Sequence, residues 1–286
     1  MPLRILFIGD VVGKPGRVML RKAVPALIDQ WKLDLVIANS ENAAGGSGLN
    51  QQCYDEITGA GVNVLTMGDH IYKKKEIMPL LQKNGHILKP ANFPPDAPGS
   101  EFVIVPARDG TPVAVFTVLG RIFMRPVDCP FRAADRMLQA IGDRARVVIV
   151  DIHAEATSDK QIMARYLDGR ASAVLGTHTH VPTADETILP GGTAFITDVG
   201  MTGPYDSILG RRVDRVSETT ITFVPTHFDV ATGDPRLCGA KLEIDPASGR
   251  ALAIERVMIR ETDTDTLATS HHLGSTSNVA DPGTAD

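Results

Sequence analysis

The sequence predicts an α/β protein in which two β-sheets pack face to face and helices cover the outer faces. Two observations support this fold class. Up to about residue 180, short apolar runs that end in polar residues alternate with amphipathic stretches, as in β-α-β units of a largely parallel sheet. Beyond that point, strand-like runs follow one another with turns between them and little helix, which indicates a second, mainly antiparallel sheet packed on the first.

The N-terminal part of the chain predicts three β-α units. The apolar run Leu3–Ile8 stops at Gly9, so it is expected to be a buried strand with Asp10 at its carboxyl end. Two further apolar runs end in the same way, one before Glu41 and the other before Asp69. The expected elements are strands at 3–8, 33–38 and 62–67, a helix at 17–31, and a helical stretch before the third strand.

The remaining elements follow from the same patterns. Proline and glycine between residues 83 and 112 indicate loops around a short strand, and the strand that begins at Val147 leads to His153. In the middle of the chain we expect strands at 102–105, 113–119, 147–150 and 171–175, with helices at 131–141 and 159–167. In the C-terminal part we expect strands at 193–197, 218–224, 241–244 and 251–259.

Length and composition predict one large domain followed by a tail. The chain has 286 residues, of which 43% are hydrophobic and 22% charged, and this is enough for a single well-buried α/β domain. We place that domain at residues 1–260. Residues 261–286 are rich in Thr, Ser, Asp and Gly and almost lack large apolar side chains, so we expect a disordered C-terminal tail that includes His271 and His272.

Charge and cysteine content indicate which kinds of binding partner and which cellular compartment to expect. The net charge of -5 gives no support to a broad basic face for nucleic acid. The three cysteines, Cys53, Cys129 and Cys238, are widely spaced without a Cys-x-x-Cys pair, which favours a reduced, cytoplasmic environment. The first apolar run reaches Gly9 too soon for a signal peptide, and no apolar stretch is long enough to span a bilayer, so we expect no membrane partner.

A His-x-His turn, His178-Thr179-His180, follows the end of a predicted buried strand. Two histidines two residues apart in extended chain can point into one cleft, whereas helical neighbours lie three or four positions apart. Neutral imidazole is a common ligand of divalent metals, so this turn is a candidate metal corner. Without further partners in the sequence, the two side chains would be ordinary loop histidines.

Four other predicted strand ends carry potential partners for this turn. Oxygen and nitrogen donors from separate strands at one sheet edge suggest a site for two divalent metals with one bridging carboxylate. Taken singly, the acidic and amide groups could be turn or cap residues and the histidine a hydrogen-bonded core residue. Their shared position favours the metal site. The donors are Asp10, Glu41 with Asn42, Asp69 with His70, and His153.

The order of these motifs resembles the calcineurin-like metallophosphoesterases, and within them the bacterial branch called YmdB. The segments that carry the resemblance are Gly-Asp-Val-Val-Gly at 9–13 and Glu-Asn-Ala-Ala-Gly-Gly at 41–46, followed by Gly-Asp-His at 68–70 and Gly-Thr-His-Thr-His at 176–180. The resemblance extends over residues 3–259. It implies a four-layer α/β/β/α sandwich of the metallophosphoesterase type.

The resemblance also implies a role for each residue. Asp10 and His180 would hold a first metal, Glu41 would bridge both ions, and Asn42 would be a further ligand or a donor to the substrate phosphate. His70 would contact phosphate and protonate the leaving group. The second metal would be held by Asp69, His153 and His178.

Three positions depart from the family pattern. The usual Asp-x-His opening is Asp10-Val11-Val12 here, so one first-metal ligand is missing and Asn42 is its candidate replacement. The bridging residue is Glu41 rather than Asp, a feature that the branch shares. Asp69 stands where the branch carries Asn, and its extra negative charge should tighten metal binding while weakening attraction for a phosphodiester anion.

The implied reaction is phosphodiester hydrolysis assisted by two divalent or trivalent ions per chain, with iron, manganese or zinc as candidates. A hydroxide bridging the ions would attack phosphorus, and 2′,3′-cyclic nucleotides are the expected substrates, with phosphorylated RNA ends as a further candidate. The alternatives are a phosphomonoesterase or 5′-nucleotidase, which differs in pocket shape, and a regulatory binding protein with a weak metal site. The resemblance further implies a homo-oligomer.

Two runs of basic residues have no assigned role in the metal site or the reaction. Lys73-Lys74-Lys75 follows His70, and Arg211-Arg212 lies in an expected lid loop. Both are candidate contacts for phosphate or RNA, although charge runs of this kind more often form solvated faces.

Overall fold

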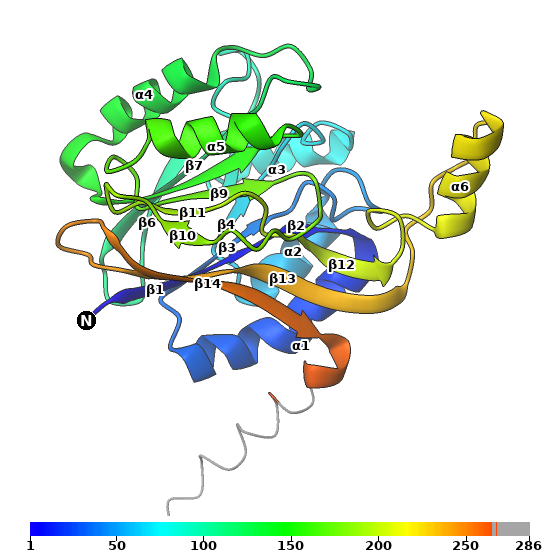
Figure 1. Ribbon diagram of the computed structural model, residues 1–286, viewed down its shortest axis with the longest axis horizontal. Coiled ribbons are helices and arrows are strands. Elements are labelled where there is room, and N and C mark those ends of the chain that lie inside the picture. The colour runs from blue at the N-terminus through cyan, green and yellow to red at the C-terminus, as the bar shows by residue number, and fades with distance from the viewer. Residues whose placement is uncertain (265–266, 268–286) are drawn as a thin grey trace, which may run out of the picture.

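Two β-sheets lie face to face at the centre of the protein, and helices cover their outer faces (Figure 1). The computed structural model describes residues 1–264 and residue 267. Within these residues the strands form one eight-stranded and one six-stranded sheet.

The first sheet is mixed. Its parallel half consists of β1 (Leu3–Ile8), β3 (Leu35–Asn39), β4 (Val64–Thr66) and β5 (Ile87–Leu88), in that spatial order. On the other side of β1 the sheet continues with antiparallel strands, where Leu3 pairs with Ile244. This half consists of β13 (Gly233–Ile244), with β14 (Ala251–Arg260) and β12 (Met201–Asp206) paired antiparallel to it, and of β2 (Asp10–Val11), which pairs parallel to β12.

The second sheet is parallel at its centre and antiparallel at both edges. The parallel strands are β7 (Pro112–Leu119), β8 (Val147–His153), β9 (Ala173–Thr177) and β11 (Ala194–Ile196). The edge strands are β6 (Phe102–Pro106) and β10 (Thr187–Ile188).

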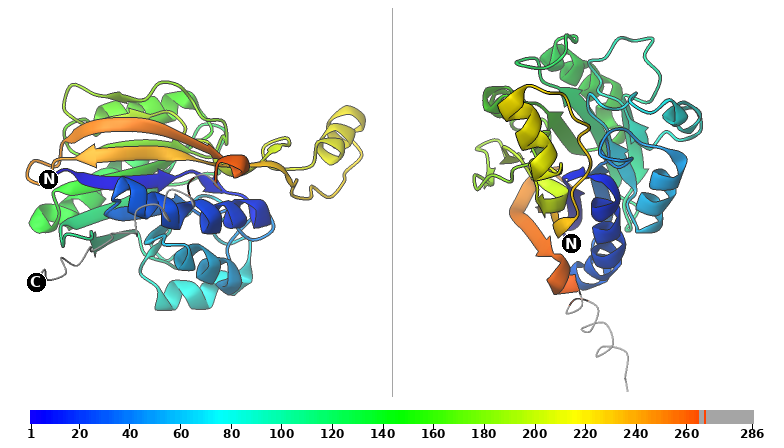
Figure 2. Two further views of the ribbon diagram at one scale, coloured as in Figure 1. Left: turned by 90° about the horizontal axis from the view of Figure 1, so that it is seen from below. Right: turned by 90° about the vertical axis from the view of Figure 1, so that its right-hand side faces the viewer.

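Helices occupy both outer faces (Figures 1 and 2). The first sheet is covered by α1 (Gly13–Trp31), α2 (Gln51–Gly59) and α3 (Met78–Lys83), the last preceded by the 3-10 turn Lys75–Ile77. The second sheet is covered by α4 (Pro130–Ile141), which continues into the 3-10 turn Gly142–Arg144, and by α5 (Thr157–Tyr166).

The core has three apolar layers, and strand periodicity explains them. Side chains alternate between the two faces of a strand. On β1, Leu6 and Ile8 therefore pack against α1 and α2, whereas Ile5 and Phe7 face the second sheet. The opposite face of the second sheet packs against α4 and α5, for example through Phe116. Three apolar layers between four layers of structure confirm the predicted α/β/β/α sandwich.

The expected allocation of strands to the two sheets was wrong. We expected the C-terminal strands to form the second sheet by themselves, but β13 and β14 extend the first sheet and the second sheet is built from residues 102–196. The pairing partner of a strand depends on which sheet edge is free in the folded chain, and the local pattern of apolar residues does not encode this.

One predicted strand is a helix. We expected a strand at 218–224, but α6 (Val213–Thr222) occupies most of that segment. The β-branched residues Thr219 to Thr222 favour a strand locally. However, α6 projects from the body of the protein, far from any sheet edge (Figures 1 and 2), and contributes no buried residue. A helix satisfies the backbone donors and acceptors of such an isolated segment internally.

The predicted tail begins with a 3-10 turn, Glu261–Asp263, and its remaining residues lie almost entirely outside the described part of the chain, including His271 and His272. Across residues 1–264, no helix is both long and apolar enough to cross a membrane.

Candidate metal centre

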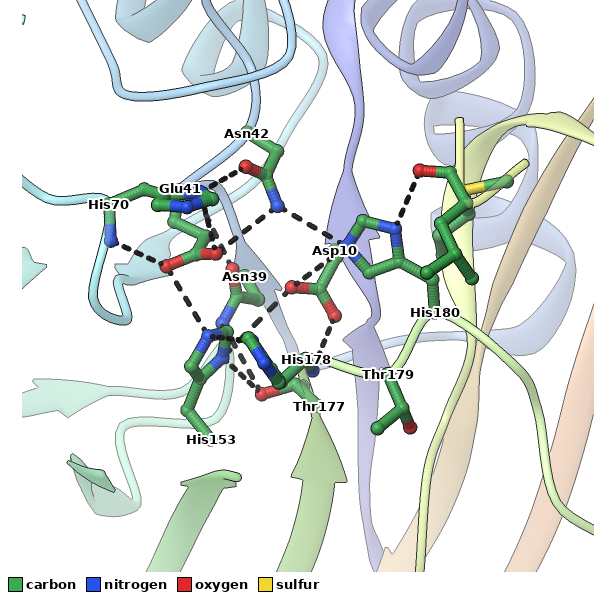
Figure 3. A network of polar contacts seen from close by, with 12 residues as sticks. Asp10, Asn39, Glu41, Asn42, His70, His153, Thr177, His178, Thr179 and His180 are labelled. Carbon is green, nitrogen blue, oxygen red and sulfur yellow. Dashed lines mark hydrogen bonds and ion pairs between the residues drawn. The ribbon is translucent and has the colours of Figure 1, made fainter. Parts of the chain in front are cut away.

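Five of the predicted site residues line one cavity of about 260 Å³, and Asp10 and His153 lie next to them (Figure 3). Glu41, Asn42, His70, His178 and His180 line it. Their strand ends do not belong to one sheet edge, as the sequence suggested. Asp10, Glu41 and Asp69 follow strands of the first sheet, whereas His153 ends β8 and His178 follows β9 in the second sheet. The site therefore bridges the carboxyl ends of both sheets.

Four residues form a compact cluster beside this cavity. One donor atom from each of Glu41, Asp69, His153 and His178 lies within 4.8 Å of the others. The Nε2 atom of His153 lies 3.3 Å from Glu41 Oε2, 3.5 Å from Asp69 Oδ1 and 3.1 Å from His178 Nδ1. Two carboxylates and two imidazoles at these distances make a mixed oxygen and nitrogen donor set, which suits transition-metal ions.

A second donor pair lies beside the cluster. Asp10 Oδ1 is 3.8 Å from His180 Nε2, and the backbone N–H of His178 donates to Asp10 Oδ2 at 3.1 Å. Oδ1 atoms of both Asp10 and Asp69 are buried and have no hydrogen-bond partner among the described residues. A buried carboxylate oxygen without a partner is costly, and a bound cation would remove that cost. The residues present therefore fit a metal centre.

The orientation of His153 is set by a buried chain of hydrogen bonds. Thr177 Oγ1 donates to Asp151 at 2.6 Å and lies 2.8 Å from His153 Nδ1. Because the threonine hydrogen is directed to the carboxylate, its oxygen accepts from Nδ1–H. In the neutral ring, this tautomer leaves the lone pair of Nε2 facing Glu41 and Asp69. Such outer partners are typical of histidines that bind metals.

The other two imidazoles are oriented in the same way. The Nε2 atom of His178 lies 3.2 Å from the Glu155 carboxylate, so Nδ1 faces the cluster. The Nδ1 atom of His180 lies 3.1 Å from the carbonyl oxygen of Leu209, which only accepts, so the lone pair of Nε2 faces Asp10. Each of the three histidines thus directs one N–H to a fixed acceptor and turns its other nitrogen towards the carboxylates.

Asn42 and His70 lie at the mouth of the cluster. The Asn42 amide nitrogen is 3.2 Å from Glu41 Oε1, which only accepts, and this orientation places the amide oxygen 2.7 Å from His70 Nδ1. His70 therefore donates Nδ1–H to Asn42, and its Nε2 is the nitrogen available in the cavity. The backbone N–H of His70 also donates to Glu41 Oε2 at 3.1 Å.

Burial disfavours the charged form of Asp10, whereas Glu41, Asp69 and His153 stabilise one another's charges. Burial raises the pKa of Asp10 to about 6, despite the opposing charges of His180 and His153. Burial would also raise the pKa of Glu41, but the charge and hydrogen bond of His153 outweigh it and lower that pKa to about 2. Burial would lower the pKa of His153, yet Glu41 and Asp69 raise it well above its usual value.

The His178–His180 turn is not the extended chain that we expected. Both His178 and His180 have positive φ angles, 96° and 64°, which non-glycine residues rarely adopt. Hydrogen bonds on both sides of the turn stabilise this strained backbone conformation. Asp10 accepts from the backbone N–H of His178, and Asp198 accepts from both the backbone N–H and the hydroxyl of Thr179.

The comparisons with known proteins agree with this geometry. A family model described as YmdB-like protein matches residues 6–257. The chain belongs to the YmdB-like family. It is 46% identical over 259 residues to a 2′,3′-cyclic-nucleotide 2′-phosphodiesterase of Bacillus subtilis (strain 168), covering 91% of this chain and 98% of that protein. The resemblance seen in the sequence is thus confirmed.

Solved structures share the YmdB-like fold. A crystal structure of a hypothetical protein from Thermus thermophilus superposes with a TM-score of 0.86 at 45% identity, covering 91% of this chain and 100% of that one. A crystal structure of a phosphatase from Mycoplasma pneumoniae gives a TM-score of 0.85 at 30% identity, covering 91% and 94% of the two chains.

Sequence reasoning missed the residues that support the YmdB-like site from behind. Asp151 accepts hydrogen bonds from Asn39, Thr66 and Thr177 beneath His153. One signal was available: Asp151 is a charged residue inside an apolar strand and shares a strand face with His153, two residues away. No local signal pointed to Glu155 or Leu209, whose contacts with the histidines are tertiary.

Proposed function

We propose that this YmdB-like protein is a metal-dependent phosphodiesterase that hydrolyses 2′,3′-cyclic nucleotides and related diesters. The observation that carries the proposal is the common orientation of His153, His178 and His180, each with one nitrogen turned towards buried carboxylates in an open cavity. The 46% identity to the Bacillus subtilis phosphodiesterase supports the substrate class.

We propose that two ions bind per chain. Asp10 and His180 would hold one ion and Asp69, His153 and His178 the other, with Glu41 between them and Asn42 beside Glu41. When bound, such ions polarise the phosphate and lower the pKa of a water that acts as nucleophile. Iron, manganese and zinc all suit mixed imidazole and carboxylate donors.

The residues of the chain contribute binding and proton transfer. His70 faces the cavity through Nε2, where a protonated ring could donate to the departing oxygen of the ester. The hydrogen bond between His70 Nδ1 and Asn42 holds the ring in that orientation. Arg211 lines the same cavity and adds a positive charge for a phosphate oxygen.

Metal content and turnover together test this function. Wild-type protein, Glu41→Gln and the control Glu243→Gln, whose carboxylate pairs with Arg4 outside the site, would be assayed with 2′,3′-cyclic AMP, bis-p-nitrophenyl phosphate and a nucleoside monophosphate. We expect bound metal and diester hydrolysis in the wild type and the control, and loss of both in Glu41→Gln. Turnover of the monoester alone would favour a phosphomonoesterase, and bound metal without any turnover would favour a regulatory binding protein.

We also propose that the protein forms a homo-oligomer in the cytoplasm. The projecting helix α6 and the chain after it expose the apolar side chains of Ile221, Phe223 and Val224, and contact with a second copy would bury them. The three free cysteines support a reducing compartment. Sedimentation analysis of the wild type and of Ile221→Asp tests the association, which the variant should weaken.

A further inference from the structure

A second hollow of about 360 Å³ opens next to the metal-site cavity. Gly45, Lys74, Arg211 and Phe228 are among the residues that line it, and we call this hollow the basic groove. Arg211 lines both cavities, and the consecutive residues Gly45 and Gly46 lie on either side of the boundary. A ligand with its phosphate at the metal site could therefore extend into the basic groove.

Arg211 forms the boundary between the two cavities. Its guanidinium donates to the carbonyl oxygens of Phe228 at 2.9 Å and of Gly45 at 3.2 Å, and also to that of Gly46. In the described part of the chain these hydrogen bonds go to carbonyl oxygens and not to a carboxylate. The arginine thus joins the glycine loop to the segment after α6, and its charge stays available to an anion.

Lys74 supplies a second cation in the lining of the basic groove. Its stem packs on Gly48, where an added Cβ would lie 2.7 Å from Lys74 Cγ. Over residues 1–264, no carboxylate forms an ion pair with its ammonium group. Its neighbours Lys73 and Lys75 are exposed, whereas Lys74 is half-buried. Of the three lysines in this run, the packing therefore singles out Lys74.

Phe228 provides an aromatic surface in the same groove. Its side chain is 37% exposed although its backbone carbonyl is held by Arg211. An aromatic ring next to two cations matches the chemistry of a nucleotide, in which a base stacks on the ring and a phosphate meets the positive charges. The protein as a whole is acidic, so this local concentration of positive charge is not a general surface property.

We propose that the basic groove binds the nucleotide that precedes a terminal 2′,3′-cyclic phosphate, so that the preferred substrate is the end of an RNA strand. This inference rests on the proposed function and specifies its substrate class. A cyclic mononucleotide has a single phosphate, which the metal site takes. Lys74 lines the basic groove and not the metal-site cavity, so it meets a phosphate only if the substrate carries a second one, as an oligonucleotide does.

Paired substrates test the inference. We would compare kcat/KM for 2′,3′-cyclic AMP with kcat/KM for an RNA dinucleotide. This dinucleotide has two adenosines joined by a 3′–5′ phosphodiester and ends in a 2′,3′-cyclic phosphate. We expect the wild type to favour the dinucleotide by about ten-fold, in line with one stacked base and one added phosphate contact. Lys74→Gln and Phe228→Ala should lower this ratio towards one, whereas Phe228→Trp should keep it.

The matched controls are Lys73→Gln and Phe123→Ala, which change exposed residues of the same types that do not line the basic groove. Both should keep the wild-type ratio. Equal kcat/KM for the two substrates in the wild type would overturn the inference and leave the proposed function intact. An equal loss for both substrates in Lys74→Gln would also overturn it.

A binding measurement separates the inference from catalysis. Calorimetric titration with the dinucleotide 3′-phosphate and with 3′-AMP does not require turnover. Tighter binding of the dinucleotide, lost in Lys74→Gln, would support the basic groove even if the enzyme hydrolysed neither cyclic substrate. Equal affinity for the two ligands would contradict it.

Discussion

Lys160 and Asp198 form a buried ion pair, 2.7 Å from Nζ to Oδ2, directly beneath the metal-site turn. Both side chains are essentially inaccessible to solvent. The same Asp198 oxygen accepts from the hydroxyl and the backbone N–H of Thr179, at 2.6 and 3.2 Å. Lys160 lies on α5 and Asp198 on the loop after β11, so the pair joins this helix and this loop to the residue between His178 and His180.

Replacing Lys160 should destabilise the fold strongly. Lys160→Met would leave Asp198 buried without its cation, and breaking a buried pair in this way costs about 3–5 kcal/mol of unfolding free energy. The control is Lys22→Met, because Lys22 pairs with Glu261 at the same 2.7 Å but on the surface, where a pair contributes less than about 1 kcal/mol. Urea denaturation measures both. Similar losses in the two variants would show that burial of the Lys160 pair has no energetic role.

Thr179 should influence metal binding without touching the metal. Thr179→Val removes the hydroxyl that anchors the turn to Asp198, so His178 and His180 lose part of their support. Outer partners of metal ligands typically affect affinity by about 10- to 100-fold. We expect a loss in that range, measured by competition with a chromophoric chelator. Thr179→Ser keeps the hydroxyl and should restore most of the affinity, and failure of this rescue would argue against the anchoring role.

Gly68 should tolerate no side chain. A Cβ at this position would overlap the ring of His153 and the carboxylate of Glu41, so Gly68→Ala must displace two cluster residues. We expect the purified variant to lose bound metal. Gly59→Ala, at the end of α2 where a Cβ meets nothing within 4 Å, is the matched control and should retain it. Elemental analysis after dialysis measures the metal bound by each variant. Full metal content in Gly68→Ala would contradict the expected displacement of His153 and Glu41.

Metal affinity should fall as the pH falls. Glu41 and Asp69 outweigh the effect of burial and raise the pKa of His153, so in the metal-free protein this ring carries a second proton, on Nε2. A cation must displace that proton, and the apparent affinity should drop about ten-fold per pH unit for each proton released. Calorimetric titration with Mn²⁺ in two buffers of different ionisation enthalpy measures the release. Identical heats in the two buffers would mean that no proton leaves.

Much of the metal centre could be predicted from the sequence because its donors follow apolar runs. A six-residue apolar run that stops at a glycine, such as Leu3–Ile8, favours a buried strand, and the polar residue after it then lies at a carboxyl end, where sites of α/β proteins form. The layers follow from the same runs, since alternate side chains of a buried strand must both meet apolar partners.

Other features were decided only in three dimensions. The pairing of β13 with β1, the helix at α6 and the positive φ angles of His178 and His180 all contradict the local pattern. Each of these features depends on what lies next to the segment in space. A free sheet edge accepts β13, whereas α6 projects away from the sheets, and the contacts of Asp10 and Asp198 fix the turn.

The sequence by itself therefore determined which residues could bind metal and how many layers the protein has, because periodic burial and residue chemistry are local properties. The tertiary structure decided which sheet each donor comes from and which nitrogen of each histidine is free. It also decided that Lys74, Arg211 and Phe228 share one groove. These relationships join residues that are distant in the chain, and only the packing of the folded protein determines such contacts.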